Sequence, residues 1–281
     1  MCLCAYVLMC LCQEKTLCAS VYKKSLCLSI HIKDLARLTY FDEICQIYYL
    51  PGFCHRPERM LKVELEKTAD GSPTLYREDI DEHYHSVKGA FAESNHIYIH
   101  LGWKKAACES ESIAVFEVGF GTGLNAVLTA QAALENKVTT IYHSVELYPL
   151  PKETIDALAP FHDERNRDIF RKMHEASWNE DAEINPYFTL KKLQASLRTL
   201  ELTPSTYDVV YFDAFAPEKQ PEMWDKTIFL KLYEALKPGG ILTTYCAKGA
   251  IRRMLQDIGF RTERLPGPPN GKREVLRATK L

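Results

Sequence analysis

The stretch "SIAVFEVGFGTGLNAVLTAQAAL", residues 112–134, decides the fold of this chain. Its first part, Ile113 to Val118, is an apolar run broken only by Glu117, as expected of a buried strand. Three glycines follow, and an apolar, alanine-rich segment then predicts a helix up to Leu134. Strand, glycine turn and helix open a nucleotide-binding α/β unit, because glycines let the backbone approach a ligand and the helix N-terminus offers free N–H groups.

The spacing of the three glycines separates two classes of cofactor. A dinucleotide fingerprint has the spacing G-x-G-x-x-G, but Leu124 stands where its last glycine would be. The spacing G-x-G-x-G, with an acidic residue two positions before the first glycine, is instead typical of methyltransferases that use S-adenosyl-L-methionine. A glycine turn that binds no ligand is the structural alternative. The predicted cofactor-binding residues of this segment are Glu117, Gly119, Gly121, Gly123 and Asn125.

A second acidic residue supports this cofactor. The segment "KVTTIYHSVELYPL" predicts a strand whose end carries Glu146, 23 residues after Gly123. This is near the offset at which a carboxylate meets the ribose hydroxyls of an adenosine, and a carboxylate can accept hydrogen bonds from both hydroxyls. An exposed carboxylate at a strand end is the alternative. We expect Glu146 to bind the ribose.

The segment "YDVVYFDAFAPEKQPEMW" places a carboxylate at the end of a buried strand. Ligands of such sheets bind outside the carboxyl ends of the strands, so Asp213 is expected to face the same cleft as the glycine turn. Pro217 and Pro221 restrict the loop that follows. A stiff loop suits a catalytic carboxylate, which must be held in a fixed position. We predict that Asp213 is the catalytic residue and also borders the cofactor.

Strands alternate with helices over the rest of the chain. Helices are predicted after Tyr148 and in the polar segment "HDERNRDIFRKMHEASWNED", and "PYFTLKKLQASL" is predicted as a strand running into a helix. This order predicts a doubly wound, mostly parallel α/β sheet, with the last two strands as an antiparallel edge. The class is the Rossmann-like, class I fold of S-adenosyl-L-methionine-dependent methyltransferases. A small hairpin and a helix are predicted to precede it, at residues 60–79 and 86–103.

Composition sets the domain boundaries. Eight of the ten cysteines lie within the first 54 residues of the 281-residue chain. We expect residues 1–59 to be a Cys-rich extension that is disordered or not native, with Met60 as the true initiator. Residues 60–281 form the methyltransferase domain, divided into the hairpin and helix (60–110) and the catalytic core (111–281). The C-x-C pairs lack zinc-site spacing, and the apolar run 2–12 is too short to span a bilayer, so we predict no metal and no membrane contact.

The charge of the chain is unevenly distributed. The formal net charge is −2, which gives no general reason to expect a nucleic-acid partner. Between Cys246 and Leu281, however, nine Lys or Arg residues stand against three Asp or Glu residues. This basic segment could contact an anionic partner, or it could be a solvated surface.

Three segments together resemble a known family: "YFDAFAPEKQPEMW", "FEVGFGTGLNA" and "GSPTLYREDIDEHYHSVKGAFAES". They are similar to the methyltransferase domain of MnmC, the tRNA 5-methylaminomethyl-2-thiouridine biosynthesis protein. The resemblance runs from about Met60 to Lys280, and the motif Asp-x-Phe-x-Pro…Pro-x-Met-Trp is its most specific part. "GKREVL" matches the family's closing basic segment. Bifunctional members carry a flavin-dependent oxidase domain after this one, so the chain is expected to be a stand-alone form.

The resemblance implies methyl transfer from S-adenosyl-L-methionine to the amine of 5-aminomethyl(-2-thio)uridine at the tRNA wobble position. It implies a cytoplasmic, monomeric enzyme in which Asp213 orients the amine. The predicted substrate-binding residues are Tyr84, Glu93, Phe215, Pro217 and Arg273, with His85 lining the same cleft. Candidate contacts to tRNA phosphates are Lys104, Lys105, Arg252, Arg253, Lys272, Arg273 and Arg277.

Two other functions stay open at this point. A small-molecule methyltransferase or a polyamine aminopropyltransferase uses a related sheet and an acidic loop after the fourth strand, but needs no basic rim. A non-catalytic protein that binds S-adenosyl-L-methionine would keep Glu146 and the glycines without turnover.

Overall fold

The computed structural model describes residues 16–20, 27–31, 63–108, 110–269 and 271–281. The chain divides into two units, Met1–Met60 and Leu61–Leu281. In the first unit, strand β1 (Thr16–Ser20) pairs antiparallel with β2 (Cys27–His31). The remainder of the predicted extension 1–59 lies outside the described residues, so its disorder or foreign origin stays a prediction.

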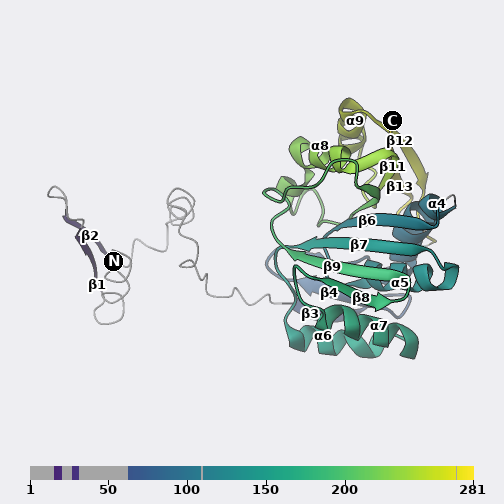
Figure 1. Cartoon of the computed structure of the whole chain (residues 1–281). Helices are drawn as coiled ribbons and strands as arrows, with labels where there is room; N and C mark the ends of the chain where they lie inside the picture. The colour runs from purple at the N-terminus through teal and green to yellow at the C-terminus, as the bar shows by residue number, and fades with distance from the viewer. Residues whose placement is uncertain (1–15, 21–26, 32–62, 109, 270) are drawn as a thin grey trace. The chain divides into compact units, whose positions relative to one another are not determined.

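One sheet organises the second unit and has eight strands in the described part of the chain (Figure 1). The strand order is β12-β13-β11-β10-β6-β7-β9-β8. The bounds are β6 (Ser112–Val118), β7 (Thr139–Glu146), β8 (Asp181–Asn185), β9 (Phe188–Gln194), β10 (Tyr207–Phe212), β11 (Leu236–Thr244), β12 (Phe260–Pro266) and β13 (Glu274–Lys280). The five central strands run parallel, whereas β8, β12 and β13 pair antiparallel. The predicted mostly parallel sheet with an antiparallel edge is confirmed, and both edges are antiparallel.

Helices pack on both faces of this sheet. Their bounds are α5 (Leu124–Asn136), α6 (Lys152–Leu158), η3 (Ala159–Phe161), α7 (Glu164–Glu175), η4 (Pro221–Trp224), α8 (Lys226–Ala235) and α9 (Gly249–Ile258). Strand β10 shows the division, because successive side chains of a strand point to opposite faces. Val209 and Tyr211 pack in the hydrophobic cluster that includes α5 and α7. Val210 and Phe212 pack in the cluster that includes α8 and α9.

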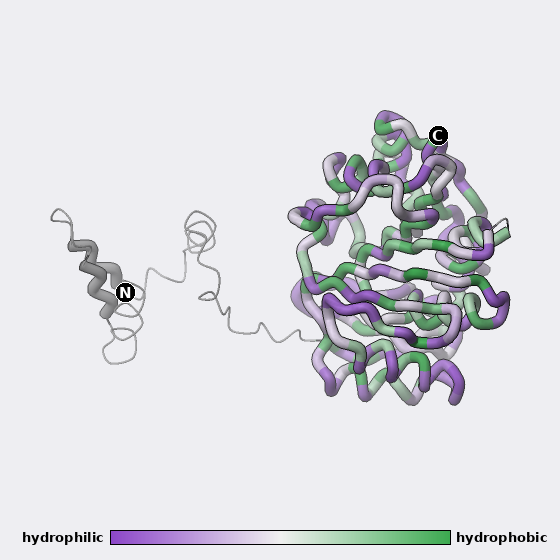
Figure 2. Tube along the Cα trace, in the orientation of Figure 1, coloured by the Kyte–Doolittle hydropathy of each residue, from purple (hydrophilic) through white to green (hydrophobic). Residues whose placement is uncertain are grey.

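Hydrophobic and hydrophilic residues are interleaved along α6 and α7 at the lower edge of the view in Figure 2. In α7 the buried residues are Asn166, Ile169, Phe170 and Met173, which recur at helical spacing on one face. The charged residues of "HDERNRDIFRKMHE" therefore lie on the outer face of a helix that covers the sheet.

The predicted hairpin and helix precede the sheet. Strands β3 (Val63–Lys67), β4 (Pro73–Arg77) and β5 (Glu82–His83) form a small antiparallel sheet. The helical segment that follows consists of α3 (Ala90–Ser94), a nine-residue π-helix η2 (Asn95–Trp103) and α4 (Lys104–Ala107). The sequence predicted a helix here, but not its π-helical winding.

The predicted helix after β9 is wrong. Residues 195–206 form turns and loop instead and lead directly into β10. Lys231 of α8 explains the difference, because its ammonium donates hydrogen bonds to the carbonyl oxygens of Leu197, Arg198 and Leu200, at 2.8, 2.9 and 2.8 Å. These acceptors then bond to a distant side chain rather than within a helix. Strand β8, which pairs antiparallel with β9, was also not predicted.

Candidate active site

A cavity of about 340 Å³ lies at the carboxyl ends of β6, β7 and β10. This volume is within the range of about 300–1,000 Å³ that is usual for small-molecule sites. The predicted site residues that line it are Tyr84, His85, Glu93, Gly119, Gly121, Asn125, Glu146, Asp213 and Phe215. Glu117, Gly123, Pro217 and Arg273 are not among its lining residues, so contacts of these four with cofactor or substrate stay predictions.

Two glycines of the turn are required by close contacts. Gly119 has φ 91°, and a Cβ there would lie 2.8 Å from the carbonyl oxygen of Asp213. Gly121 has φ 51°, and a Cβ there would lie 3.1 Å from the ring of Tyr84. Because only glycine adopts such φ values without strain, the turn can approach both the end of β10 and the N-terminal hairpin.

The glycine turn is also held from the side of α7. His174 Nε2 lies 3.1 Å from the carbonyl oxygen of Thr122. Burial lowers the pKa of His174 to about 4, so the imidazole is neutral at pH 7. A carbonyl oxygen can only accept, so Nε2 carries the proton and donates it to this bond. Phe120, which lies within the turn between Gly119 and Gly121, packs edge-on against Trp178 at 6.0 Å between ring centroids.

Glu146, the last residue of β7, holds the glycine turn through a hydrogen bond. Its Oε2 accepts a hydrogen bond from the N–H of Gly121 at 3.2 Å, and its Oε1 accepts one from the N–H of Tyr148 at 2.9 Å. Burial raises the pKa of this carboxyl, and the backbone N–H donors oppose that rise. A carboxylate offers about four acceptor sites, and backbone donors occupy only part of them, so Glu146 keeps acceptor capacity.

Asp213 lies at the end of β10, directly beside the glycine turn. Its N–H donates to the carbonyl oxygen of Val118 at 3.1 Å, which fixes the backbone of β10 against β6. Its Oδ1 accepts a hydrogen bond from the hydroxyl of Tyr98 at 2.7 Å, and its Oδ2 accepts one from Nδ2 of Asn125 at 2.8 Å. Burial raises the pKa of Asp213 to about 6, against the lowering effect of these two donors. The carboxyl is therefore mostly ionised at pH 7 and protonates under mildly acidic conditions.

The loop after Asp213 is held by side chains from three places. Tyr245 donates from its hydroxyl to the carbonyl oxygen of Ala214 at 2.9 Å, and the Trp224 indole donates to the carbonyl oxygen of Phe215 at 2.7 Å. The N–H of Ala216 donates to Glu82 Oε2 at 3.0 Å. The loop is thus fixed by the N-terminal hairpin as well as by the sheet.

Aromatic side chains form one wall of the cavity. The ring of Phe215 meets the ring of Tyr84 edge-on at 5.1 Å, and the guanidinium of Arg77 lies 5.4 Å from the Phe215 ring centroid. Phe215 lines the cavity and also packs against Tyr84, and its contact with substrate stays a prediction. Trp224 is 5% exposed and packs against Phe212 and Phe229, as core packing requires.

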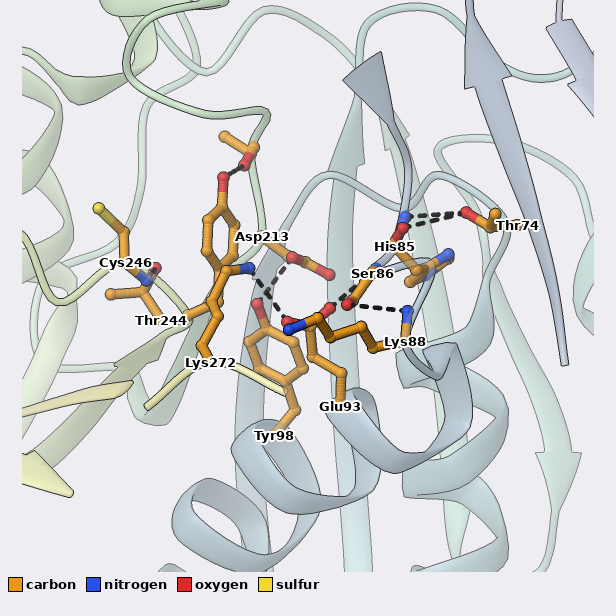
Figure 3. A network of polar contacts seen from close by, with 12 residues as sticks. Thr74, His85, Ser86, Lys88, Glu93, Tyr98, Asp213, Thr244, Cys246 and Lys272 are labelled. Atoms are coloured by element: carbon orange, nitrogen blue, oxygen red, sulfur yellow. Dashed lines mark hydrogen bonds and ion pairs between the residues drawn. The ribbon is translucent and has the colours of Figure 1, made fainter. Parts of the chain in front are cut away.

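A second carboxylate lies near Asp213 (Figure 3). Glu93 is 8% exposed; its Oε2 accepts from the N–H of Ser86 at 3.0 Å, and its Oε1 accepts from Nζ of Lys272 at 3.1 Å. The ammonium of Lys272 also lies 3.9 Å from the Tyr245 ring centroid. Lys272 lines the cavity, whereas its neighbour Arg273 is exposed and does not.

Glu117 lies beneath the cavity and is fully buried. Its Oε2 accepts from the Ser144 hydroxyl at 2.6 Å, and its Oε1 has no hydrogen-bond partner among the described residues. Burial raises the pKa of Glu117 to about 8, so this carboxyl is mostly protonated at neutral pH.

Two of the other residues predicted to contact tRNA phosphates form hydrogen bonds with neighbouring side chains. Arg277 donates to Glu263 Oε2 at 3.1 Å, and Arg252 donates to Gln256 Oε1 at 3.3 Å. Lys104, Lys105 and Arg253 are exposed. Among the seven candidate phosphate contacts, all of them described residues, Lys272 alone lines the cavity.

Sequence reasoning missed several residues of the site. Tyr98 and Tyr245 each contact Asp213 or its loop, and Glu82 binds the loop backbone. No motif or spacing identifies them, because their partners are 115, 31 and 134 residues away in the chain. The sequence marks Glu82 only as an acidic residue in a short strand after the hairpin, and this does not indicate a contact with the loop.

Within the described ranges, no group of three or more His, Cys, Asp or Glu side chains is arranged to hold a metal ion. No described helix combines the length and apolar composition needed to cross a bilayer.

Comparisons with known proteins show which proteins this chain is similar to. Residues 165–281 match the model of a family described as S-adenosyl-L-methionine-dependent methyltransferase. The tRNA 5-methylaminomethyl-2-thiouridine biosynthesis bifunctional protein MnmC of Cupriavidus metallidurans is 30% identical over 222 residues, 73% of this chain and 32% of that protein. The same-named protein of Leptospira interrogans is 29% identical over 218 residues, 72% of this chain and 33% of that protein. The chain thus spans about a third of the length of these curated relatives.

A solved structure extends the similarity to the fold. MnmC2 from Aquifex aeolicus superposes with a TM-score of 0.66 at 26% identity, covering 78% of this chain and 70% of that chain. This chain belongs to the S-adenosyl-L-methionine-dependent methyltransferases related to MnmC. The predicted resemblance to the methyltransferase domain of MnmC is confirmed. Spermidine synthase from Thermotoga maritima matches with a TM-score of 0.52 at 13% identity, a likeness of fold alone.

The residues present fit S-adenosyl-L-methionine, the cofactor of the MnmC-related methyltransferases. A Cβ at Gly119 or Gly121 would reduce the room at the turn, and Glu146 keeps acceptor capacity where ribose hydroxyls are expected. Leu147 and Tyr148, both 45% exposed, extend the cavity lining beyond Glu146 with the apolar surface that a purine ring requires.

Proposed function

We propose that this chain transfers a methyl group from S-adenosyl-L-methionine to the primary amine of 5-aminomethyl(-2-thio)uridine at the tRNA wobble position. The observation that carries the proposal is that one cavity joins the glycine turn to Asp213, a carboxylate with free acceptor capacity. The names of the MnmC relatives, which state biosynthesis of tRNA 5-methylaminomethyl-2-thiouridine, support the choice of substrate.

The chemistry needs a neutral amine in line with the methyl group. The bound cofactor supplies an electrophilic methyl group on a sulfonium sulfur. An amine attacks through its lone pair, which the protonated form lacks. Asp213 has one protein donor on each oxygen, so each oxygen can accept a further N–H from the amine. It thereby aims the lone pair, and it would stabilise the ammonium that forms as the nitrogen–carbon bond is made and the carbon–sulfur bond breaks, with a neutral thioether as the leaving group. The released proton passes to water.

Other residues hold the two reactants. Glu146 accepts hydrogen bonds from the ribose hydroxyls of the cofactor, and Asn125 fixes the far side of the Asp213 carboxylate. Phe215, braced by Tyr84, offers a ring face or edge to the uracil. Glu93, which is paired with the Lys272 ammonium, lines the same cavity.

The tRNA is recognised at the rim of the catalytic domain itself. Lys272 lines the cavity at the start of the closing basic segment, so it is the first candidate for a phosphate contact. The base must leave its stack to enter a cavity of this size, as in other enzymes that modify bases. Affinity for tRNA should fall steeply as the salt concentration rises.

The alternatives have weaker support. Aminopropyl transfer rests on the acidic loop and on a likeness of fold to spermidine synthase at 13% identity. A non-catalytic role gives no reason for a carboxylate with unused acceptor capacity beside the cofactor turn.

The test is methyl transfer to tRNA isolated from cells that make the aminomethyl base but cannot methylate it. Digestion to nucleosides followed by mass spectrometry should show the methylaminomethyl base, and fully modified tRNA should accept nothing. Putrescine serves as the control acceptor, tested with S-adenosyl-L-methionine for methyl transfer and, in a parallel reaction, with decarboxylated S-adenosyl-L-methionine for aminopropyl transfer. Modification of putrescine with none of tRNA would overturn the proposal in favour of a small-molecule enzyme, and turnover of neither would favour the non-catalytic role.

A further inference from the structure

We propose that Tyr98 is a positioning residue for this methyl transfer, which holds one oxygen of the Asp213 carboxylate and thereby sets both its direction and its charge state. The inference rests on the function proposed above. Tyr98 is 1% exposed and is not among the residues lining the cavity, so it acts on the substrate through Asp213 alone.

The geometry of the contact is that of a strong hydrogen bond. The Tyr98 hydroxyl lies 2.7 Å from Asp213 Oδ1, and a carboxylate can only accept, so the hydroxyl donates. Burial and the nearby Asp213 charge raise the pKa of Tyr98, which keeps the donor proton on the hydroxyl at all working pH values. Figure 3 shows the ring of Tyr98 rising from its helix toward Asp213.

The π-helix explains how this hydroxyl reaches the end of β10. Three residues of this helix face the sheet. The rings of Tyr98 and Tyr211 lie 5.1 Å apart between centroids, and a Cβ on Gly102 would lie 3.1 Å from the ring of Tyr211. Trp103 Nε1 donates a hydrogen bond to Thr140 Oγ1 at 3.1 Å. In an α-helix, residues five apart differ by about 140° in direction. In a π-helix, residues five apart are joined by the i→i+5 hydrogen bond and lie on one face.

π-helices are rare and occur frequently at functional sites. The winding of η2 thus has a specific use here. Trp103 anchors one end of the π-helix to β7, and five residues earlier Tyr98 is presented to the catalytic carboxylate of β10.

Several other groups act on the charge of Asp213. Among the described residues they are Glu93 of α3, Glu117 of β6, Asn125 of α5, Tyr142 of β7, Tyr245 after β11 and Lys272 before β13. Glu93 raises the pKa of Asp213, whereas Lys272 and the Asn125 amide lower it. The Tyr98 hydroxyl lowers this pKa more than any other group does. Removal of the Tyr98 hydroxyl should therefore raise the pKa of Asp213.

The experiment compares Tyr98→Phe with Tyr211→Phe. Tyr211 is a matched control, because it is fully buried beside Tyr98 but its hydroxyl contacts Thr129 rather than Asp213. Carbon-13 NMR of labelled aspartate follows the Asp213 carboxyl, whose signal is identified by its loss in Asp213→Asn. We expect Tyr98→Phe to raise the titration midpoint by about one pH unit and Tyr211→Phe to leave it in place.

Activity gives the second measurement. The acidic limb of the pH–rate profile should move upward by the same amount in Tyr98→Phe, while KM for S-adenosyl-L-methionine stays unchanged. An unmoved midpoint in Tyr98→Phe, or equal shifts in both variants, would overturn the proposal. The NMR result is independent of the substrate, so a failure of tRNA methylation and a failure of the Tyr98 role are distinguishable.

The wild-type protein provides a test that does not depend on a variant folding. The Tyr98 Cζ resonance should titrate together with Asp213, with a midpoint near pH 6, because the hydroxyl loses its charged acceptor there. The Tyr211 resonance should not follow that titration. A flat Tyr98 signal across this range would also overturn the proposal.

Discussion

Glu146 and Asp213 end two strands that flank β6, and they line the same cavity, but they are held in different ways. The oxygens of Glu146 accept from backbone N–H groups, those of Gly121 and Tyr148. The oxygens of Asp213 accept from side chains, those of Tyr98 and Asn125. Burial raises the pKa of both carboxyls.

The difference suits two functions. Backbone donors belong to the turn itself, so the position of Glu146 is coupled to the shape of the cofactor cradle. Of the side-chain donors to Asp213, Tyr98 comes from a separate element, the π-helix, and can adjust the charge of Asp213 without altering the cradle. We therefore expect Glu146 to govern cofactor affinity and Asp213 to govern turnover.

The largest effect is expected for Asp213→Asn. The amide has nearly the same shape but carries no charge and offers a single acceptor oxygen, so it cannot stabilise the forming ammonium. Turnover should fall by a factor of about 100 or more, while affinity for S-adenosyl-L-methionine changes by less than about threefold. Single-turnover methyl transfer and isothermal titration calorimetry measure the two quantities. A variant with undiminished turnover would remove Asp213 from the mechanism.

The sequence predicted the position of Asp213 but not its contact with Tyr98. Glycines, a strand-end carboxylate and the proline-limited loop are local patterns, so Gly119, Gly121, Glu146 and Asp213 could be found from them. Tyr98 could not, because its contact with Asp213 spans 115 residues and depends on π-helical winding that apolar spacing does not reveal.

The fold was predictable to a similar extent. Alternating strands and helices give the parallel sheet, because each element has its own periodic pattern. The helix predicted after β9 failed for a tertiary reason: Lys231, more than 30 residues away, binds three carbonyl oxygens of that segment. The tRNA-contacting surface depends on side chains of many segments, and charge counting along the chain does not place them.

The second effect tests whether the two carboxylates are coupled through the turn. In Gly119→Ala, a Cβ would lie 2.8 Å from the Asp213 carbonyl oxygen, at a φ of 91° that alanine rarely adopts. The turn and the β10 end must separate, at a cost of about 2 kcal/mol in the free energy of unfolding. We expect roughly tenfold losses in both cofactor affinity and turnover.

Gly239→Ala is the matched control for backbone strain. Gly239 also has positive φ, 78°, but a Cβ there meets nothing within 4 Å. It should lower the melting temperature without changing cofactor affinity. Equal losses of affinity in both variants would show that strain alone, rather than the contact with Asp213, explains the effect at Gly119.

The third effect separates the two carboxylates. Glu146→Gln keeps one acceptor oxygen and loses the charge, so cofactor affinity should fall about tenfold, equivalent to about 1.4 kcal/mol. Turnover at saturating cofactor should change little, because Glu146 does not contact the amine. Calorimetry and saturating single-turnover rates measure this pair. A turnover loss as large as that of Asp213→Asn would contradict the division of functions.

The smallest effect is the pH dependence of the wild-type enzyme. Burial raises the pKa of Asp213 to about 6, so the carboxylate protonates as the pH falls through that value, and turnover at saturating cofactor should be about half its plateau there. Above that pH the group is ionised and the rate should be level until other groups titrate. Asp213→Asn has no carboxyl to titrate at this position, so its residual rate should lack this limb. The free substrate amine titrates identically in both assays, so the ratio of the two kcat/KM values for the substrate cancels that titration and reports the difference at position 213. A ratio that stays constant from about one pH unit below this midpoint to one unit above it would show that the charge of Asp213 is not what turnover requires.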